Sequence, residues 1–199
     1  EVIEMLGGVK VGASRYEFDY DYRKVFKTLM LSGVVPDKVS HQYYPTPMTM
    51  AQRVVDQAMI EPHHVCLEPS AGFGGIARFM PVGQTICVEI TVLGARALRS
   101  KGFKTVERDF IGWAEESFNS GLRVDRVCMN PPFSEGRADM HLNAALKLLR
   151  PNGRLVAILP SGARKKAAPA GYQFEWSEVL SNEFQDTTVS VVILTATRV

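Results

Sequence analysis

Residues 64–75 read HVCLEPSAGFGG, a short apolar run that passes directly into a glycine-rich turn. Such a run before such a turn is typical of a buried strand in a parallel sheet. The same alternation of short apolar runs with stretches of helical periodicity continues from residue 41 to residue 199. It predicts an α/β fold in which helices cover both faces of a parallel sheet.

The other elements are predicted from the same periodicities. Pro47 opens a helix whose apolar positions recur at helical spacing: Met50, Val54, Val55, Ala58 and Met59. Two more helices are predicted over 92–101 and 138–149. After the strand at 64–67, we expect strands over 84–88, 105–107, 124–129, 154–159 and 189–197. The last strand is apolar at both odd and even positions, which is typical of burial on both faces.

The composition is that of an ordinary globular domain. The chain has 199 residues, of which 46% are hydrophobic and 22% charged, and its net charge is +2. These proportions exclude disordered, collagen-like and coiled-coil proteins. The longest apolar run, 189–196, is too short to cross a bilayer, and residues 1–4 lack the layout of a signal peptide. Three widely spaced cysteines in predicted strands favour reduced core residues. We therefore expect a cytoplasmic protein without a membrane segment.

The first forty residues differ from the rest of the chain. Residues 15–23 are aromatic and mixed in charge, and an apolar-periodic stretch with Val25, Phe26, Leu29 and Met30 follows them and ends at Gly33. A glycine directly after the last periodic residue is a common helix stop. We expect residues 1–40 to form a helical appendage that packs on a main domain of residues 41–199.

Four polar residues follow predicted strands: Glu68, Glu89, Asp109 and Asn130. Because ligands of an open parallel sheet bind outside the carboxyl ends of its strands, we expect these side chains at one rim. The glycine-rich turn lets a ligand approach the backbone closely. Glu89 follows Gly72 by 17 residues, and a carboxylate there is suited to accept hydrogen bonds from two ribose hydroxyls. The pattern predicts a nucleoside-type cofactor and leaves NAD and S-adenosylmethionine open.

The tetrapeptide Asn130-Pro131-Pro132-Phe133 directly follows an apolar strand. Two consecutive prolines continue neither a strand nor a helix, so they fix a rigid, extended loop. This loop presents the Asn130 amide oxygen and the Pro131 carbonyl as two acceptors for one exocyclic amino group, whose nitrogen thereby becomes a usable nucleophile. The Phe133 ring is suited to stack on a planar base.

The motifs together resemble the amino-group DNA methyltransferases, and above all the N6-adenine enzymes whose cofactor motifs precede the catalytic one. They occur in the family's order: Tyr44-Pro45-Thr46-Pro47, Leu67 to Gly74, Val88-Glu89, Asp109-Phe110 and Asn130 to Phe133. The resemblance covers about residues 41–199 and is strongest to small phage- and plasmid-borne members, which act in restriction–modification. It implies a Rossmann-like class I methyltransferase fold: a mostly parallel seven-stranded sheet with helices on both faces and an antiparallel last strand.

The resemblance also implies roles for the matching residues. The methionine part of S-adenosylmethionine is expected against Tyr44, Thr46 and Pro47 and the turn with Glu68, Ser70, Ala71, Gly72 and Gly74. Glu89 is expected to bind the ribose hydroxyls, Asp109 the cofactor's adenine amino group, and Phe110 the adenine ring. The catalytic residues are expected to be Asn130, Pro131, Pro132 and Phe133, which bind the flipped target base. No metal site is expected, and we interpret His41, His63, His64 and His141 as surface or packing residues.

The chain departs from the family in having no stretch long enough for a target-recognition domain. The basic run Arg164-Lys165-Lys166 lies in an expected mobile insertion over 162–171 and is suited to touch phosphates, which carry no sequence information. A nucleic-acid partner, DNA above all, is therefore expected, together with the option of a partner subunit that supplies specificity.

Several alternatives stay open at this point. The same loop also serves N2-guanine RNA methyltransferases and glutamine-amide protein methyltransferases. A catalytically silent relative that binds nucleic acid and an NAD-dependent oxidoreductase are further options, although the latter leaves the Asn130 loop unexplained.

Overall fold

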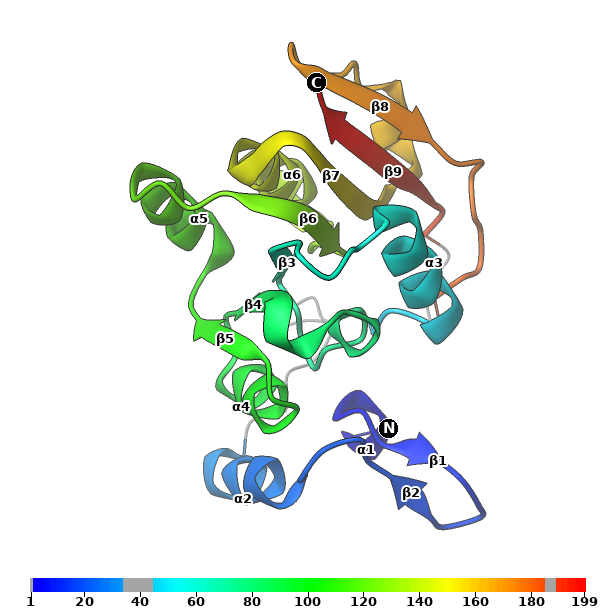
Figure 1. Ribbon diagram of the computed structural model, residues 1–199. Helices are drawn as coiled ribbons and strands as arrows, with labels where there is room; N and C mark the ends of the chain where they lie inside the picture. Colours follow the sequence, from blue (N-terminus) through cyan, green and yellow to red (C-terminus); the bar gives the residue numbers. More distant parts are fainter. Residues whose placement is uncertain (1, 34–44, 185–188) are drawn as a thin grey trace.

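The computed structural model describes residues 2–33, 45–184 and 189–199 (Figure 1). Within them, a seven-stranded sheet has the spatial order β5-β4-β3-β6-β7-β9-β8. Its strands are β3 (Cys66–Pro69), β4 (Thr85–Glu89), β5 (Lys104–Glu107), β6 (Val124–Met129), β7 (Leu149–Pro160), β8 (Tyr172–Trp176) and β9 (Val191–Arg198). Its flanking helices are α3 (Met48–Ala58), α4 (Val92–Ser100), α5 (Phe110–Asn119) and α6 (Arg137–Leu148).

Strand β3 lies at the point where the strand order reverses. It pairs in parallel with both β4 and β6, and β4–β5 and β6–β7 are parallel as well. The chain therefore runs from β3 out to β5, and α5 then brings it back to β6 on the other side of β3. Within the described sheet, β9 alone runs opposite to the other strands, since it is antiparallel to both β7 and β8. The predicted mostly parallel sheet with an antiparallel last strand is confirmed, and its switch point is where such sheets bind ligands.

The two faces of the sheet carry different cores. Leu67 and Met129 pack on the face covered by α5 and α6. Cys66 and Cys128 pack with α3 on the opposite face, and Cys87 packs with Leu98 of α4. All three cysteines are free and buried, as predicted, because strand alternation turns each of them toward the α3–α4 layer.

Five details differ from the sequence-based expectation. Strand β7 starts at Leu149 and not at 154, because Leu149 already pairs with Val124 of β6 and an irregularity in the pairing absorbs residues 150–153. Asn152 in this irregularity has φ 62°. Helix α5 and edge strand β8 were not predicted. Met59 and Met30, expected on buried helix faces, are exposed, Met59 because it is the left-handed C-cap that ends α3.

The N-terminal segment comprises α1 (Val2–Met5), the short strands β1 (Val9–Lys10) and β2 (Tyr16–Glu17), and α2 (Arg23–Ser32), which ends at the left-handed Gly33 as predicted. Leu6, Tyr20 and Val25 pack in one apolar cluster with residues of the glycine-rich turn and of α4. Asp19 forms ion pairs with Arg78 and Lys101. The division at residue 40 stays a prediction, since residues 34–44 lie outside the described ranges.

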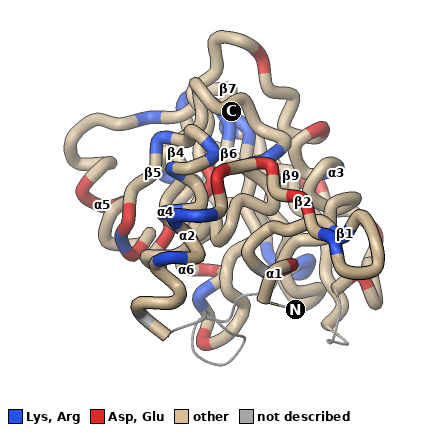
Figure 2. Tube along the Cα trace, turned by 90° about the horizontal axis from the view of Figure 1, so that it is seen from below, with Lys and Arg blue, Asp and Glu red and all other residues tan. Residues whose placement is uncertain are grey.

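Charged residues of both signs are interspersed along the chain trace in Figure 2. None of the helices in the described ranges is long and apolar enough to span a membrane.

Candidate functional site

A pocket of about 250 Å³ opens at the carboxyl ends of β3, β4, β5 and β6. Residues from five sequence motifs line it, although up to 87 positions separate them in the chain. Most of the predicted site residues lie there: Thr46, Glu68, Ser70, Ala71, Gly72, Glu89, Asp109, Phe110, Asn130, Pro131, Pro132 and Phe133. The prediction that the strand ends meet at one rim is therefore confirmed.

Three of the predicted cofactor-binding residues are not part of this lining. Tyr44 lies outside the described residues. Pro47 is the N-cap of α3. Gly74 has φ 81°, and a Cβ there would lie 3.0 Å from Leu98 of α4, so glycine permits both the turn and the close packing of helix against turn.

The carboxylate of Glu89 is held by two backbone groups. It accepts hydrogen bonds of 2.7 Å from the N–H of Gly72 and from the N–H of Thr91. Each oxygen keeps a further lone pair for a ligand hydroxyl. Gly94 adds a constraint that the sequence reasoning missed: a Cβ there would lie 2.8 Å from the Glu89 side chain and 2.7 Å from the Gly72 carbonyl. A larger residue would thus displace the acid and the turn together.

Glu68 is a buried acid whose Oε2 has no hydrogen-bond partner within the described structure. Burial raises the pKa of this carboxyl well above its usual range, and the nearby Glu89 charge raises it further, while backbone N–H groups of Ala77 and Ile76 oppose the shift. A ligand that brings a positive charge or a donor would stabilise the charged form.

Asp109 and Phe110 begin helix α5. The Asp109 side chain accepts a hydrogen bond of 3.2 Å from the Gly112 N–H and thereby caps the helix. Phe110 lines the pocket and is also part of the sheet core, where it packs 6.1 Å from the Trp113 ring. Phe110 is thus at once part of the pocket wall and part of the core.

Asn130 is oriented by a residue far away in the chain. Its amide nitrogen donates a hydrogen bond of 3.1 Å to the Thr46 hydroxyl. Its Oδ1 is buried and has no partner among the residues described. The asparagine therefore presents a fixed, unused acceptor in a pocket whose walls include Pro131, Pro132 and Phe133.

His141 was interpreted from sequence as a surface or packing residue, and the structure places it in the pocket wall. It is 2% exposed, its Nδ1 lies 3.1 Å from the Ser70 hydroxyl, and its Nε2 has no partner in the described structure. Burial lowers its pKa to about 4. A sequence signal existed, because His141 shares the apolar helix face of Ala138, Leu142 and Ala145. Burying a polar side chain on such a face is costly unless it forms a hydrogen bond.

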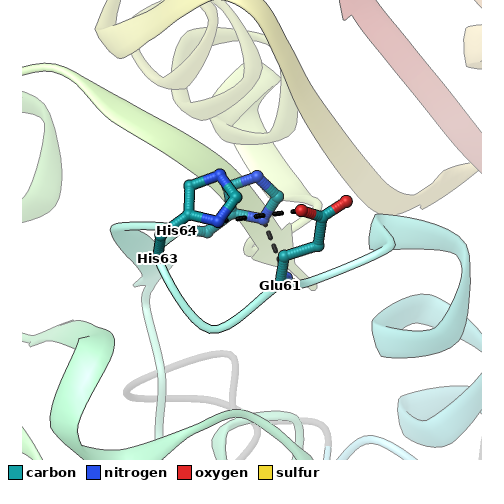
Figure 3. Close-up of side chains that lie close together, drawn as sticks. All are labelled: Glu61, His63 and His64. Atoms are coloured by element: carbon teal, nitrogen blue, oxygen red, sulfur yellow. Dashed lines mark hydrogen bonds and ion pairs between the residues drawn. The ribbon is translucent and has the colours of Figure 1, made fainter.

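A second group of chemically capable residues lies at the opposite end of β3. Glu61, His63 and His64 are close enough to suggest metal ligation (Figure 3). However, the His64 Nδ1 already accepts a hydrogen bond of 2.8 Å from the Glu61 N–H, so the neutral ring carries its proton on Nε2. Neither nitrogen of His64 is then free to bind a metal.

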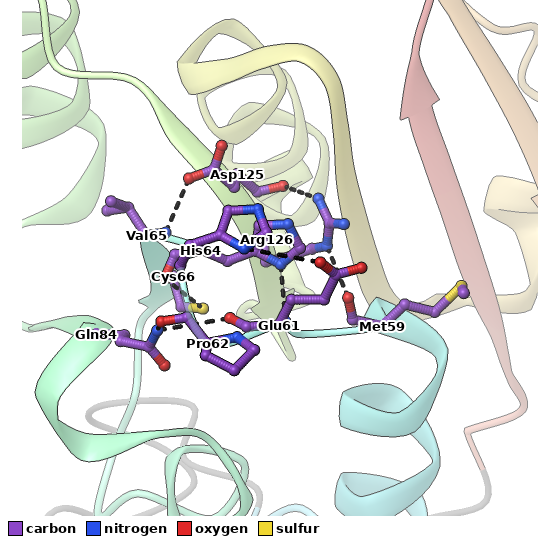
Figure 4. A network of polar contacts seen from close by, with 10 residues as sticks. Met59, Glu61, Pro62, His64, Val65, Cys66, Gln84, Asp125 and Arg126 are labelled. Atoms are coloured by element: carbon purple, nitrogen blue, oxygen red, sulfur yellow. Dashed lines mark hydrogen bonds and ion pairs between the residues drawn. The ribbon is translucent and has the colours of Figure 1, made fainter.

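The surroundings of His64 also oppose a cation. Burial and the Arg126 charge lower the His64 pKa, against the smaller opposing effect of the Glu61 and Asp125 charges. Arg126 itself donates to the Met59 carbonyl, and Asp125 accepts a hydrogen bond of 2.8 Å from the Val65 N–H (Figure 4). This network links the loop before β3 to strand β6. Its hydrogen bonds join groups of the protein to one another, so its role is structural.

The predicted phosphate-contacting residues lie on the short helix η4 (Ser161–Lys165) and just after it. Strand β7 is parallel to β6, so η4, which follows β7, lies at the same rim of the sheet as the pocket. Arg164 and Lys165 are exposed. Lys166 forms an ion pair with Asp139 of α6, which ties this segment to the helix that carries His141.

Comparisons with known proteins agree on the fold. No family model and no curated protein matches the sequence. Among solved structures, a protein from Vibrio vulnificus YJ016 named as the modification subunit of a type I restriction enzyme has a TM-score of 0.67 at 15% identity, over 88% of this chain and 48% of its own. PH1948 from Pyrococcus horikoshii, named as an RNA methyltransferase, has a TM-score of 0.62 at 22% identity, over 89% of this chain and 100% of its own.

TrmN from Thermus thermophilus has a TM-score of 0.59 at 21% identity, over 76% of this chain and 49% of its own. The fold is that of the Rossmann-like methyltransferases. The chain spans about half the length of TrmN and of the Vibrio subunit.

Proposed function

We propose that this chain is an S-adenosylmethionine-dependent methyltransferase that methylates an exocyclic amino nitrogen of a nucleic-acid base, with adenine N6 in DNA as the target. The observation that carries the proposal is the Asn130 Oδ1: a buried, oriented and unused acceptor in the pocket at the switch point of the sheet. A buried acceptor without a partner is unfavourable unless a ligand completes it.

The pocket residues fit the proposed cofactor. Glu68, with one buried oxygen unpartnered, is suited to the cofactor's ammonium group. Glu89 has lone pairs available for the ribose hydroxyls, and Asp109 and Phe110 are suited to the adenine amino group and ring. When bound, S-adenosylmethionine would supply an electrophilic methyl group attached to a sulfonium. Several acidic side chains near one cation favour its binding.

Asn130 and the rigid proline corner would act on the acceptor. The Asn130 Oδ1 and the Pro131 carbonyl would accept both N–H groups of the exocyclic amine, which polarises these bonds and localises the nitrogen lone pair. The Thr46 hydroxyl keeps the amide from rotating, since it binds the Asn130 amide nitrogen. The chain thus supplies orientation and electrostatic stabilisation, and an in-line displacement needs no protein nucleophile.

A DNA target is supported by the motif Tyr44-Pro45-Thr46-Pro47 before β3, whose Thr46 contacts Asn130. An RNA base is the second candidate. PH1948, which is named as an RNA methyltransferase, is covered over its full length by this chain, so a chain of this size is comparable with a protein named for RNA methylation. The likeness to a restriction-enzyme modification subunit supports a partner subunit that supplies sequence specificity.

The test is incubation of the protein with methyl-labelled S-adenosylmethionine and separate pools of DNA, RNA and protein, followed by mass spectrometry of the digests. We expect N6-methyladenine from the DNA pool. N2-methylguanine from RNA or methylglutamine from protein would overturn the DNA assignment and keep the cofactor. Absence of transfer together with no thermal stabilisation by S-adenosylmethionine would overturn the proposed function.

A further inference from the structure

The Nε2 of His141 is a buried polar atom in the pocket that the proposed function leaves unused. Three buried side-chain atoms without a partner occur in the described structure, on Glu68, Asn130 and His141, and all three residues line this pocket. Under the proposed function, Glu68 binds the cofactor's ammonium group and Asn130 binds the exocyclic amine of the target base. The third atom therefore points to a further contact with whatever fills the pocket.

Ser70 holds the imidazole in place. Its hydroxyl lies 3.1 Å from the Nδ1 of His141, so a turn residue after β3 and a helix residue of α6 form one polar pair. The Ser70 backbone has φ 57°, a left-handed conformation that a residue with a side chain rarely adopts. This conformation directs the hydroxyl toward α6 and leaves the Nε2 as the free end of the pair.

The imidazole is also suited to a cationic ligand. Burial lowers the His141 pKa to about 4, while the nearby Asp109 charge raises it and the Arg137 charge lowers it. The ring is therefore neutral at pH 7 and does not repel a sulfonium. A neutral ring has one donor and one acceptor nitrogen, and adenosine offers partners of both kinds.

The neighbours of His141 indicate which part of the ligand it meets. Its ring centroid lies 5.2 Å from that of Phe110, and Phe110 follows Asp109 at the start of α5. Both residues belong to the adenine end of the pocket under the proposed function, on which this step rests. We propose that His141, oriented by Ser70, is a further cofactor-binding residue whose Nε2 hydrogen-bonds to the adenosine moiety of S-adenosylmethionine.

Two substitutions distinguish the role of Nε2 from that of Nδ1. His141→Asn keeps an amide near the position of Nδ1 and removes the group at Nε2, whereas His141→Gln extends an amide to the Nε2 position. Calorimetry without nucleic acid measures the affinity of each variant for S-adenosylmethionine and for methylthioadenosine, which has the adenosine but no amino-acid part. We expect about a tenfold loss of affinity for both ligands in His141→Asn, and less than about a threefold loss in His141→Gln.

Ser70→Gly tests the positioning role. It relieves the left-handed backbone, which offsets the loss of the Nδ1 partner, so the unliganded protein should stay close to the wild type in stability, yet cofactor affinity should fall about threefold. In the His141→Asn background the same substitution should cause no further loss, because no Nε2 remains to be oriented. A merely structural serine would instead change stability and give additive losses.

Unchanged affinity of His141→Asn for methylthioadenosine overturns the inference, as does an equal loss in His141→Asn and His141→Gln. A rise only in the KM for nucleic acid also overturns it and assigns His141 to the acceptor. If the wild type itself binds no S-adenosylmethionine, the proposed function fails, which is a different result from a wild type that binds and a His141→Asn variant that binds equally well.

Discussion

The buried and half-buried polar groups at the two ends of strand β3 differ in whether their hydrogen bonds are made within the protein. At the start of the strand, His64 and Asp125 have hydrogen-bond partners from the backbone of the neighbouring loop and strand. At the carboxyl end, Glu68, Asn130 and His141 each keep one buried atom without a partner in the described structure. Both clusters contain residues capable of chemistry. The difference teaches that polar groups with hydrogen-bond partners in the protein indicate a structural role. Buried polar atoms without a partner in a pocket indicate a bound ligand.

Asn130→Ala should give the largest effect and tests the functional end directly. We expect methyl transfer to fall by about 100-fold to 1,000-fold, since a preorganised acceptor at the reacting nitrogen is lost. Affinity for S-adenosylmethionine should stay within about threefold of the wild type. Single-turnover kinetics and calorimetry on the same preparation measure both quantities.

The matched control is Asn143→Ala on the exposed side of α6, for which we expect transfer at the wild-type rate. Near-normal transfer by Asn130→Ala would contradict the catalytic assignment and remove the contrast between the two ends of β3.

The pH dependence of stability sharpens the contrast through His141. Its pKa is about 4 in the folded protein and about 6.5 when unfolded. Between these values the unfolded chain binds a proton that the folded protein does not, so stability falls as the pH decreases from 6.5 to 4. Over this pH range, His141 lowers the free energy of unfolding by about 3 kcal/mol.

Denaturant unfolding at several pH values should show a smaller loss in His141→Asn than in the wild type. The difference between the two proteins isolates the histidine from Glu68, whose raised pKa acts in the opposite direction. Parallel curves for the two proteins would show that the imidazole titrates normally and is accessible to solvent.

Asp125→Ala tests the structural end of β3. The substitution leaves the Val65 N–H without its 2.8 Å acceptor and removes the ion pair with Arg150. We expect a loss of about 2 kcal/mol in the free energy of unfolding. Methyl transfer measured at a temperature where the variant is folded should stay at the wild-type level.

The exposed Glu115→Ala on α5 is the control, with a change within about 0.5 kcal/mol. A stable Asp125→Ala variant with impaired transfer would reverse the assignment of roles to the two ends of the strand.

Arg164→Ala and Lys165→Ala should give the smallest effects. Both residues are exposed at the pocket rim, so each variant should weaken nucleic-acid binding a few-fold for all sequences alike. The slope of log affinity against log salt should decrease by about one per residue. Lys147→Ala, at the far end of α6, is the control and should leave the slope unchanged. An unchanged slope in both rim variants would exclude the basic run from the interface.

Much of the fold was predictable because it depends on local patterns. Short apolar runs predicted six of the seven strands of the described sheet, and β6 has the predicted bounds. Strand β8 was missed because it is an edge strand with alternating burial that comes directly after the insertion expected over 162–171. Helix α5 was missed although its N-cap, Asp109, was identified for another reason.

The sequence by itself determined which polar residues follow the strands and that a proline corner ends β6, since both are properties of neighbouring residues. Only the tertiary structure decided that Thr46 orients Asn130 across 84 positions, that Ser70 meets His141 across 71, and that His64 is satisfied where His141 is not. The physical reason is that the need of a buried polar group for a partner depends on contacts between distant segments, which no local pattern encodes.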